Sequence, residues 1–281
     1  MRLGGFLKVK YEGPEEWVGH HKRLGYTAAY CPPEVMNAAD DAAMRPWLDA
    51  ARKADLTIAE VGTWSSTMSL DAETRAKGVR LCQERLALAD RIGCPCCVNL
   101  SGSLGEPWNG HHPDNLTPKT FDRVVETVRE IIDAVKPARA FYTLEAMPWQ
   151  FPNSTESYVR LVKAIDRKSF AVHYDPCNMV GDITTYYSTG GMIREFVAAL
   201  GPHIKSVHLK DVSMGHRNTV QISEVIPGQG VLDYRTLLTE LDRLGRDLPL
   251  MLEHLKTEEE YVQAAGHVRR TAKAAGVELR A

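Results

Sequence analysis

The sequence predicts an α/β protein with the (β/α)8 TIM barrel fold, in a single domain that covers residues 1–281. Short apolar runs alternate eight times with longer helical patterns, and no change in composition marks a linker. A barrel of this kind usually takes about 250 residues, which fits the chain length. An open, doubly wound sheet is the structural alternative. It fits less well, because no glycine-rich phosphate loop follows the first apolar run.

Each expected strand is a short apolar run, rich in β-branched or aromatic residues and bounded by turn residues or proline. In chain order these runs cover residues 3–7, 27–31, 57–61, 96–100, 140–145, 170–175, 204–208 and 248–253. Most of the expected helices carry a recognisable start or stop. Pro14 suits a first turn, Ser154 and Asp233 suit the N-cap position, and Gly25 and Gly93 suit the position after a last turn.

The helical patterns themselves are alanine-rich or show an apolar face at helical spacing. They cover residues 14–25, 39–54, 70–92, 117–135, 154–166, 192–200, 233–244 and 257–275. Residues 101–115 and 212–230 are predicted to be long loops. Loops of this length in compact domains are often functional.

Composition excludes several classes of function. The chain is 44% hydrophobic and 25% charged, which is ordinary for a globular protein, and 34 basic against 36 acidic residues leave no electrostatic footprint for nucleic acid. The N-terminus has no secretory apolar region and no stretch is long enough to span a membrane, so we expect a cytoplasmic protein. A homo-oligomer stays open. Six cysteines, including those of Cys94-Pro-Cys-Cys97, are expected to be buried, reduced thiols.

Four successive apolar runs end on a residue that can ligate a metal: Glu145, Asp175, His208 and Glu253. In a barrel the C-terminal ends of the strands face one rim, where catalytic groups lie. Three carboxylates gathered there would repel one another unless a cation were present. Oxygen-rich ligation with one nitrogen suits Mn²⁺ or Mg²⁺, with Co²⁺ and Zn²⁺ also open. Each residue alone is more often a cap, a surface group or a barrel histidine; the coincidence of four favours a metal site.

Three motifs accompany this series: His208-Leu-Lys-Asp211, Pro227-Gly-Gln-Gly230 and Leu252-Glu-His254. With them the chain resembles the xylose isomerase-like TIM barrel superfamily, and within it the sugar phosphate isomerase/epimerase group that includes ketose 3-epimerases and inosose dehydratases. The resemblance covers essentially the whole chain. It implies a metal-dependent isomerase or epimerase that acts on a ketose, a keto-sugar or a related polyhydroxy carbonyl compound.

The resemblance also implies roles for the four residues. All four would hold Mn²⁺ or a similar ion, and Glu145 and Glu253 would flank the sugar and move protons between adjacent carbons through an enediolate. The chain departs from the ketose 3-epimerases at two positions, where Asn178 replaces a histidine and Ala146 replaces a proline. The resemblance therefore does not imply the same substrate as that of the ketose 3-epimerases. No cluster of basic residues indicates a phosphate.

Further residues are candidates for contacts with a carbohydrate substrate, each with a structural alternative. Lys210 could orient substrate or form an internal salt bridge, and His173 lies on the same strand face as Asp175 and could instead fill the barrel. We expect His254 to point away from Glu253. The whole set of candidate substrate contacts is Glu60, Trp64, Trp108, His111, His112, His173, Asn178, Lys210 and Asp211.

Three other functions are alternatives to an isomerase or epimerase. A dehydratase or lyase acting on an inosose or a 3-keto sugar would begin with the same proton abstraction. An apurinic endonuclease shares the superfamily, but it would need extra histidines on the early strands and a basic face, and the sequence has neither. A non-catalytic carbohydrate-binding subunit is the rival from a different class, and the presence of all four apparent ligands argues against it.

Overall fold

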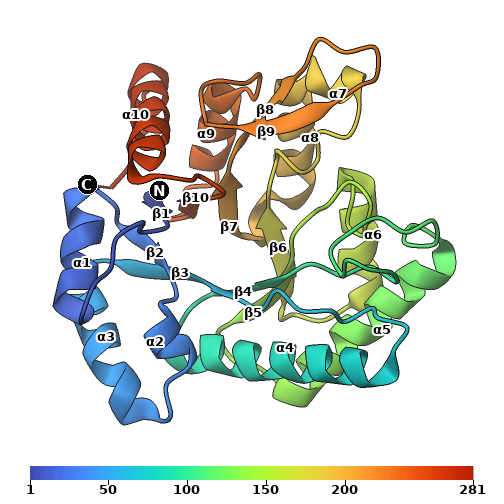
Figure 1. Ribbon diagram of the computed structural model, residues 1–281, viewed down its shortest axis with the longest axis horizontal. Helices are drawn as coiled ribbons and strands as arrows, with labels where there is room; N and C mark the ends of the chain where they lie inside the picture. The colour runs from blue at the N-terminus through green and yellow to red at the C-terminus, as the bar shows by residue number, and fades with distance from the viewer. Residues whose placement is uncertain (281) are drawn as a thin grey trace. The chain divides into compact units, whose positions relative to one another are not determined.

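The computed structural model describes residues 1–280 (Figure 1). Eight parallel strands form a closed barrel in the order β1-β10-β7-β6-β5-β4-β3-β2, and β8 and β9 form a separate two-stranded sheet. This confirms the predicted fold class. The chain divides into two compact units, which are described in turn. That residues 1–281 form one domain stays a prediction.

The first unit contains Met1–Ala59, Asp175–Pro202 and the chain from Ser206 onward. Its strands are β2 (Ala28–Tyr30), β1 (Arg2–Gly5), β10 (Pro249–Leu252) and most of β7 (Ile204–Leu209), each parallel to the next. Its helices are α1 (Pro14–Arg23), α2 (Pro33–Met36), α3 (Asp41–Lys53), α7 (Ile183–Tyr186), α8 (Thr189–Leu200), α9 (Tyr234–Asp242) and α10 (Glu258–Ala275). The register pairs Met251 with His208, so β10 and β7 end side by side.

The second unit contains Glu60–Tyr174 and His203–Lys205. Its parallel strands are the second half of β3 (Thr57–Gly62), then β4 (Cys96–Asn99), β5 (Phe141–Leu144) and β6 (Phe170–Tyr174). The helices α4 (Ala72–Ile92), α5 (Pro118–Val135) and α6 (Thr155–Ile165) follow β3, β4 and β5. The register pairs Asn99 with Leu144 and Leu144 with Val172, which brings the ends of three strands to one level.

Local signals set most of the element boundaries as the sequence predicts. The Ser154 hydroxyl accepts the N–H of Ser157 at the start of α6, and the Asp233 carboxylate accepts the N–H of Thr236 at the start of α9. Gly93 ends α4 in the left-handed conformation, with φ of 76°. Such caps satisfy N–H groups and carbonyls that a helix end leaves without partners.

The prediction that residues 212–230 form a plain loop is wrong. The segment contains the antiparallel hairpin of β8 (Asp211–Met214) and β9 (Ile222–Val225). Half-buried Met214 and Ile222 pack with buried Val212 against Cys177 and Tyr186, so the hairpin has an apolar side of its own. The polar residues between the strands conceal this alternation in the sequence. The short helices α2 and α7 were not predicted either, because four residues carry too little periodicity.

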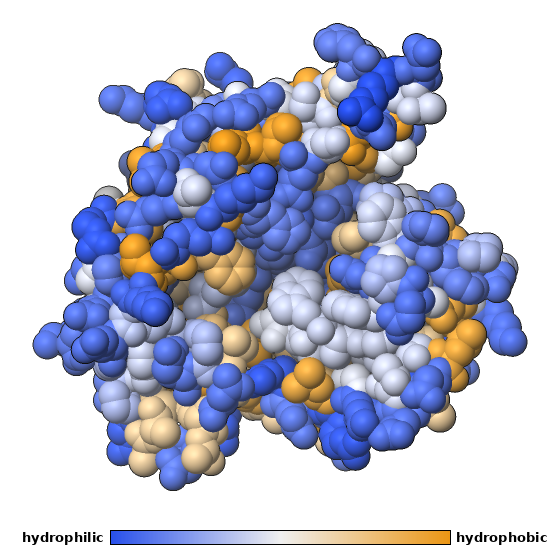
Figure 2. All heavy atoms as spheres, in the orientation of Figure 1, coloured by the Kyte–Doolittle hydropathy of each residue, from blue (hydrophilic) through white to orange (hydrophobic). Residues whose placement is uncertain are grey.

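The distribution of polar and apolar side chains is that of a globular protein. On the face drawn in Figure 2, hydrophilic residues predominate and hydrophobic ones are scattered. Within residues 1–280, no helix is long and apolar enough to cross a membrane. All six cysteines are free and buried, as predicted, and burial raises the pKa of the Cys96 thiol well above its ordinary value.

Candidate metal centre

Three of the predicted ligands lie in the first unit at strand ends. Asp175 follows β6, His208 lies near the end of β7, and Glu253 follows β10. Their exposed fractions are 0%, 0% and 5%. Burying ionisable groups this deeply is costly unless partners compensate, so their contacts decide what the site can hold.

His208 joins the two carboxylates. Its Nδ1 lies 3.0 Å from Oε1 of Glu253 and 3.8 Å from Oδ2 of Asp175. The other oxygen of Asp175, Oδ1, accepts the backbone N–H groups of Cys177 and Asn178 at 2.9 and 3.1 Å. These bonds fix the Asp175 carboxylate so that Oδ2 points toward His208. Asn178 therefore acts here through its backbone; a contact of its side chain with substrate stays a prediction.

Lys210 supplies a cation to the same oxygens. Its Nζ lies 2.7 Å from Oδ2 of Asp175, 2.6 Å from Oε1 of Glu253 and 3.9 Å from Oε2 of Glu224. The lysine side chain is 1% exposed. An ammonium group at this point shows that the two carboxylates are arranged to accept positive charge. Of the two readings of Lys210, the internal salt bridge is present, and a substrate contact stays a prediction.

Glu145, the remaining predicted ligand, lies in the second unit. It directly follows β5, is 4% exposed, and its N–H donates to the carbonyl of Asn99 at 2.9 Å. In the first unit, Asp175, His208 and Glu253 can each offer one ligand atom, and these three atoms lie within 4.8 Å of one another. Two carboxylates and one imidazole are donors that suit a hard or borderline divalent cation. This buried cluster could therefore bind a divalent metal ion. That Glu145 supplies a fourth ligand stays a prediction.

The charges around Glu253 keep it ionised. Burial alone raises the pKa of a carboxyl group, but the charges of His208 and Lys210 outweigh burial and hold the pKa of Glu253 well below its usual range. His254 adds to this, with Nε2 at 3.5 Å from Glu253 Oε1 and Nδ1 at 3.0 Å from Glu224 Oε2. The hydrogen bond to Glu224 raises the pKa of His254.

The expectation that His254 points away from Glu253 is wrong. His254 has φ of 58°, in the left-handed region, so the chain no longer follows the alternation of a strand. The turn brings its ring back toward the carboxylate. Glu224, which holds the other side of the ring, was not singled out in the sequence, because its place on β9 depends on the hairpin that the sequence conceals.

Asp211 organises the loop that follows β9. Its Oδ1 accepts the N–H groups of Val212 and Leu232, each at 2.9 Å, and its Oδ2 accepts those of Gly228 at 2.9 Å and Gly230 at 3.1 Å. Gly228 has φ of 93°, and a Cβ on Gly230 would lie 2.2 Å from Asp211 Oδ1. This explains both glycines of the motif Pro227-Gly-Gln-Gly230. A contact of Asp211 with substrate stays a prediction.

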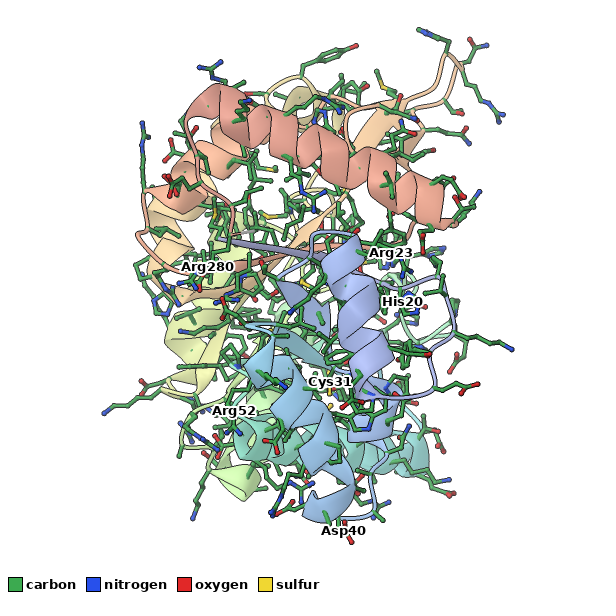
Figure 3. The ribbon with its side chains drawn as sticks, turned by 90° about the vertical axis from the view of Figure 1, so that its left-hand side faces the viewer. His20, Arg23, Cys31, Asp40, Arg52 and Arg280 are labelled. Carbon is green, nitrogen blue, oxygen red and sulfur yellow. The ribbon has the colours of Figure 1, made fainter. Side chains whose placement is uncertain are left out.

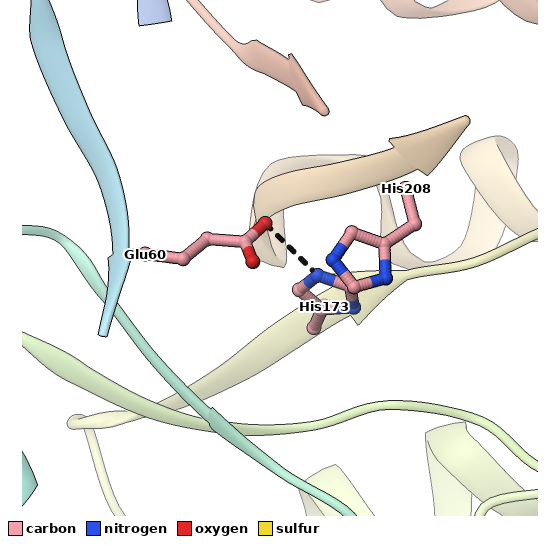
Figure 4. A group of neighbouring side chains, drawn as sticks. All are labelled: Glu60, His173 and His208. Carbon is pink, nitrogen blue, oxygen red and sulfur yellow. Dashed lines mark hydrogen bonds and ion pairs between the residues drawn. The ribbon is translucent and has the colours of Figure 1, made fainter. Parts of the chain in front are cut away.

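A second buried pair lies in the second unit. His173 Nε2 and Glu60 Oε1 are 3.1 Å apart, and the side chains are 0% and 1% exposed (Figure 4). The pair restricts the orientation of His173. Substrate contacts of Glu60 and His173 stay predictions.

The loop after β4 is fastened from within. The Asn115 side chain donates to Ser103 Oγ, to the Gly110 carbonyl and to the Trp149 carbonyl, at 3.1 to 3.2 Å. Its Oδ1 accepts the N–H of Leu104. The candidates on this loop are less buried, since His111 is exposed, and Trp108 and His112 are half-buried. Trp64, the second residue after β3, is 43% exposed. Substrate contacts of these four side chains stay predictions.

Sequence reasoning also missed Tyr30, at the end of β2. Its ring centroid lies 6.2 Å from that of His208, and its hydroxyl donates to the Leu252 carbonyl at 3.4 Å. The only signal for it is its position as the last residue of a barrel strand. A tyrosine at that position is equally consistent with a purely structural role in the hydrophobic core.

Comparison with known proteins agrees with this geometry. The family described as xylose isomerase-like TIM barrel matches residues 20–271. The chain belongs to this family. A comparison with curated protein sequences finds no match. Among solved structures, endonuclease IV from Thermus thermophilus is similar, with a TM-score of 0.73, 18% identity, and 98% of this chain and 100% of that chain covered.

Two further members of this structural group carry out different chemistry. A probable 3-DHS dehydratase from Bacillus anthracis has a TM-score of 0.70 at 13% identity, with 95% and 97% of the two chains covered. A D-psicose 3-epimerase, solved in the presence of D-fructose, has a TM-score of 0.68 at 17% identity, with 98% and 100% covered. Similarity at such low identity shows the shared fold, and function must be argued from the site itself.

Proposed function

We propose that the protein is a divalent-metal-dependent sugar isomerase or epimerase acting on a ketose, a keto-sugar or a related polyhydroxy carbonyl compound. The observation that carries the proposal is the buried group of Asp175, His208 and Glu253, which is a suitable set of metal ligands. We propose that Glu145, which is buried at the end of β5, joins them as a fourth ligand and as the second glutamate of the site. Mn²⁺ is the proposed ion, with Mg²⁺, Co²⁺ and Zn²⁺ as alternatives. We further propose a cytoplasmic location and a small carbohydrate as the only substrate partner.

The four side chains would hold the ion, which would supply Lewis acidity toward a carbonyl oxygen and a neighbouring hydroxyl oxygen of the sugar. Glu145 and Glu253 are the proposed acid and base. Glu253 is kept ionised by His208 and Lys210, as a base must be before it accepts a proton. It would take the proton from the carbon beside the carbonyl, an enediolate would form in the substrate, and Glu145 would return a proton from the other side.

A dehydratase or lyase is the second candidate, because the first step would be the same. If the substrate carries a leaving group β to the carbon that loses its proton, elimination competes with reprotonation. The similarity to a probable dehydratase supports keeping this outcome. The nearly balanced charge of 34 basic and 36 acidic residues disfavours a nuclease that must bind a polyanionic backbone.

The test is a screen of ketoses, inososes and 3-keto sugars with Mn²⁺ in D₂O. A true substrate should gain deuterium at the carbon beside its carbonyl, whether it then epimerises or eliminates. Glu145→Gln and Glu253→Gln should each lower the rate by about two to four powers of ten, the usual range for a positioned acid or base. Metal content must be measured in both variants. Normal turnover by both metal-loaded variants would refute the two-glutamate mechanism.

A further inference from the structure

A cavity of about 220 Å³ lies in the first unit beside the ends of β1 and β2. We name it the aromatic pocket. Its wall is formed mainly by aromatic and aliphatic side chains, among them Phe6, Leu7, Trp17, Tyr30, Pro33 and Met36. Pockets lined in this way bind apolar groups, and the few polar atoms in them fix orientation.

His21 and Tyr11 contribute polar rings to the wall, and neither carries a charge at neutral pH. His21 is 2% exposed, and its Nδ1–H donates a hydrogen bond to the Trp17 carbonyl at 2.8 Å. Burial lowers the pKa of His21 to about 4, so the ring is neutral. The Tyr11 hydroxyl donates a hydrogen bond to Oε2 of Glu34 at 3.5 Å. No side chain of the wall carries a charge, so the aromatic pocket suits an uncharged ring better than a charged ligand.

Tyr30 joins the aromatic pocket to the candidate metal centre. It lines the pocket, while its ring centroid lies 6.2 Å from that of His208 and its hydroxyl donates to Leu252, the residue before Glu253. Phe6 stacks on Tyr30 with a centroid distance of 3.9 Å and an interplanar angle of 11°. Phe6 is also 42% exposed, so this stack forms an open rim rather than a closed core.

Helix α1 has an exposed side and a side that faces the aromatic pocket. Figure 3 looks onto α1 and α3 and labels Cys31, a buried residue of the pocket wall, together with His20 and Arg23 of α1. His20 and Arg23 contact each other at the exposed surface, whereas Trp17 and His21 of the same helix are buried. One side of α1 thus faces solvent and the other supplies the pocket.

We propose that the aromatic pocket binds an apolar six-membered ring that the polyhydroxy substrate carries as a substituent. The proposal rests on the proposed function for its sugar part. A cavity of about 150 Å³ with apolar walls is enough to hold benzene, so this one can hold a substituted ring. A substrate held at His208 and Glu253 would extend past Tyr30, and its ring would lie against Phe6, Trp17 and Met36. The preferred substrates would then be keto-sugars with an aromatic substituent.

The first experiment tests the pocket without the sugar. Phenol is titrated into the Mn²⁺-loaded protein and into the protein after chelation, and binding is followed by saturation-transfer NMR. Phenol should bind equally in both. Met36→Trp and, independently, Leu7→Trp should abolish binding by filling the pocket, whereas Met36→Leu, which nearly keeps the volume, should retain it. No binding by the wild type, or unchanged binding in both tryptophan variants, would overturn the proposal.

The second experiment tests the substituent. Methyl and phenyl 3-oxo-β-D-glucopyranosides are compared by calorimetry on the Mn²⁺-loaded protein. The phenyl compound should bind about ten-fold tighter in the wild type, because its ring leaves water, and the preference should vanish in Met36→Trp. Equal affinities in the wild type would overturn the proposal. If phenol binds as expected but neither glycoside binds, the pocket is supported and the sugar chemistry of the proposed function fails instead.

Discussion

Lys210 Nζ lies 2.6 Å from Oε1 of Glu253 and 2.7 Å from Oδ2 of Asp175, two atoms of the group that could hold a metal ion. The lysine therefore neutralises carboxylates that a divalent ion would also neutralise. Positive charges placed on shared oxygens oppose each other, since Coulomb energy at such distances is large in a buried site. The lysine and the ion should compete.

Lys210→Met should consequently change metal binding and stability in opposite directions. Without the ammonium, the free energy of unfolding of the metal-free protein should fall by about 3 kcal/mol, the usual cost of removing one partner of a buried ion pair. The affinity for Mn²⁺ should rise at least about ten-fold. Calorimetric titration of metal and denaturant unfolding measure both effects. Lys168→Met, at an exposed position, is the control. Unchanged or weaker Mn²⁺ binding in a folded Lys210→Met protein would contradict the competition.

Asp211→Ala should loosen the chain between β8 and α9. The carboxylate accepts four backbone N–H groups, from Val212, Gly228, Gly230 and Leu232. Losing a buried acceptor of several bonds should lower the free energy of unfolding by about 3 kcal/mol or more. Asp233→Ala, which removes the N-cap of α9 and its bond to the Thr236 hydroxyl, should cost about 1 kcal/mol. Limited proteolysis should cut residues 226–232 faster in the first variant alone. Equal stability and equal cleavage in the two variants would show that Asp211 does not hold the loop.

The loop after β4 should contribute to substrate binding and not to the metal site. Trp108, His111 and His112 lie on a segment that Asn115 fastens through its side chain. Changing these three to alanine should lower kcat/KM on the substrate found by the screen and leave metal content unchanged. Steady-state kinetics and elemental analysis of the same preparation measure the two quantities. Wild-type kcat/KM in the triple variant would exclude a covering role.

His21 should make the protein less stable in mild acid. Burial lowers its pKa from the ordinary 6.5 to about 4, so between these values the unfolded chain takes up a proton that the folded chain does not. The contribution of His21 to the free energy of unfolding is fully present above pH 6.5 and falls as the pH drops toward 4. The total loss amounts to about 3 kcal/mol. In His21→Asn this part of the pH dependence should be missing, whereas His20→Gln, on the exposed side of α1, should keep it. Parallel curves for wild type and His21→Asn would contradict the assignment.

The barrel and the four candidate ligands could be predicted because each rests on a local signal. Apolar runs alternate with capped helices, and Glu145, Asp175, His208 and Glu253 each follow or end such a run. The rest depends on contacts between distant segments. The hairpin of β8 and β9 is stabilised by packing against Tyr186 and by the Asp211 carboxylate, and the sequence shows neither.

For the same reason, the residues that surround the candidate ligands could not be predicted from the sequence. Glu224 and His254 meet because β9 is a strand and because His254 adopts a left-handed conformation, which strand alternation cannot anticipate. Tyr30 lies beside His208 only through the neighbouring ends of β2, β1, β10 and β7. Pairwise positions of this kind follow from register and packing and not from composition.

The most direct test of the account is diffraction at the manganese absorption edge from crystals grown with Mn²⁺. We predict one anomalous peak per chain, with oxygens of Glu145, Asp175 and Glu253 and one ring nitrogen of His208 each at about 2 Å from it. The Lys210 ammonium should have moved away from the shared oxygens. A peak that lies elsewhere, or four side chains that all stay more than about 3 Å from any ion, would contradict the account.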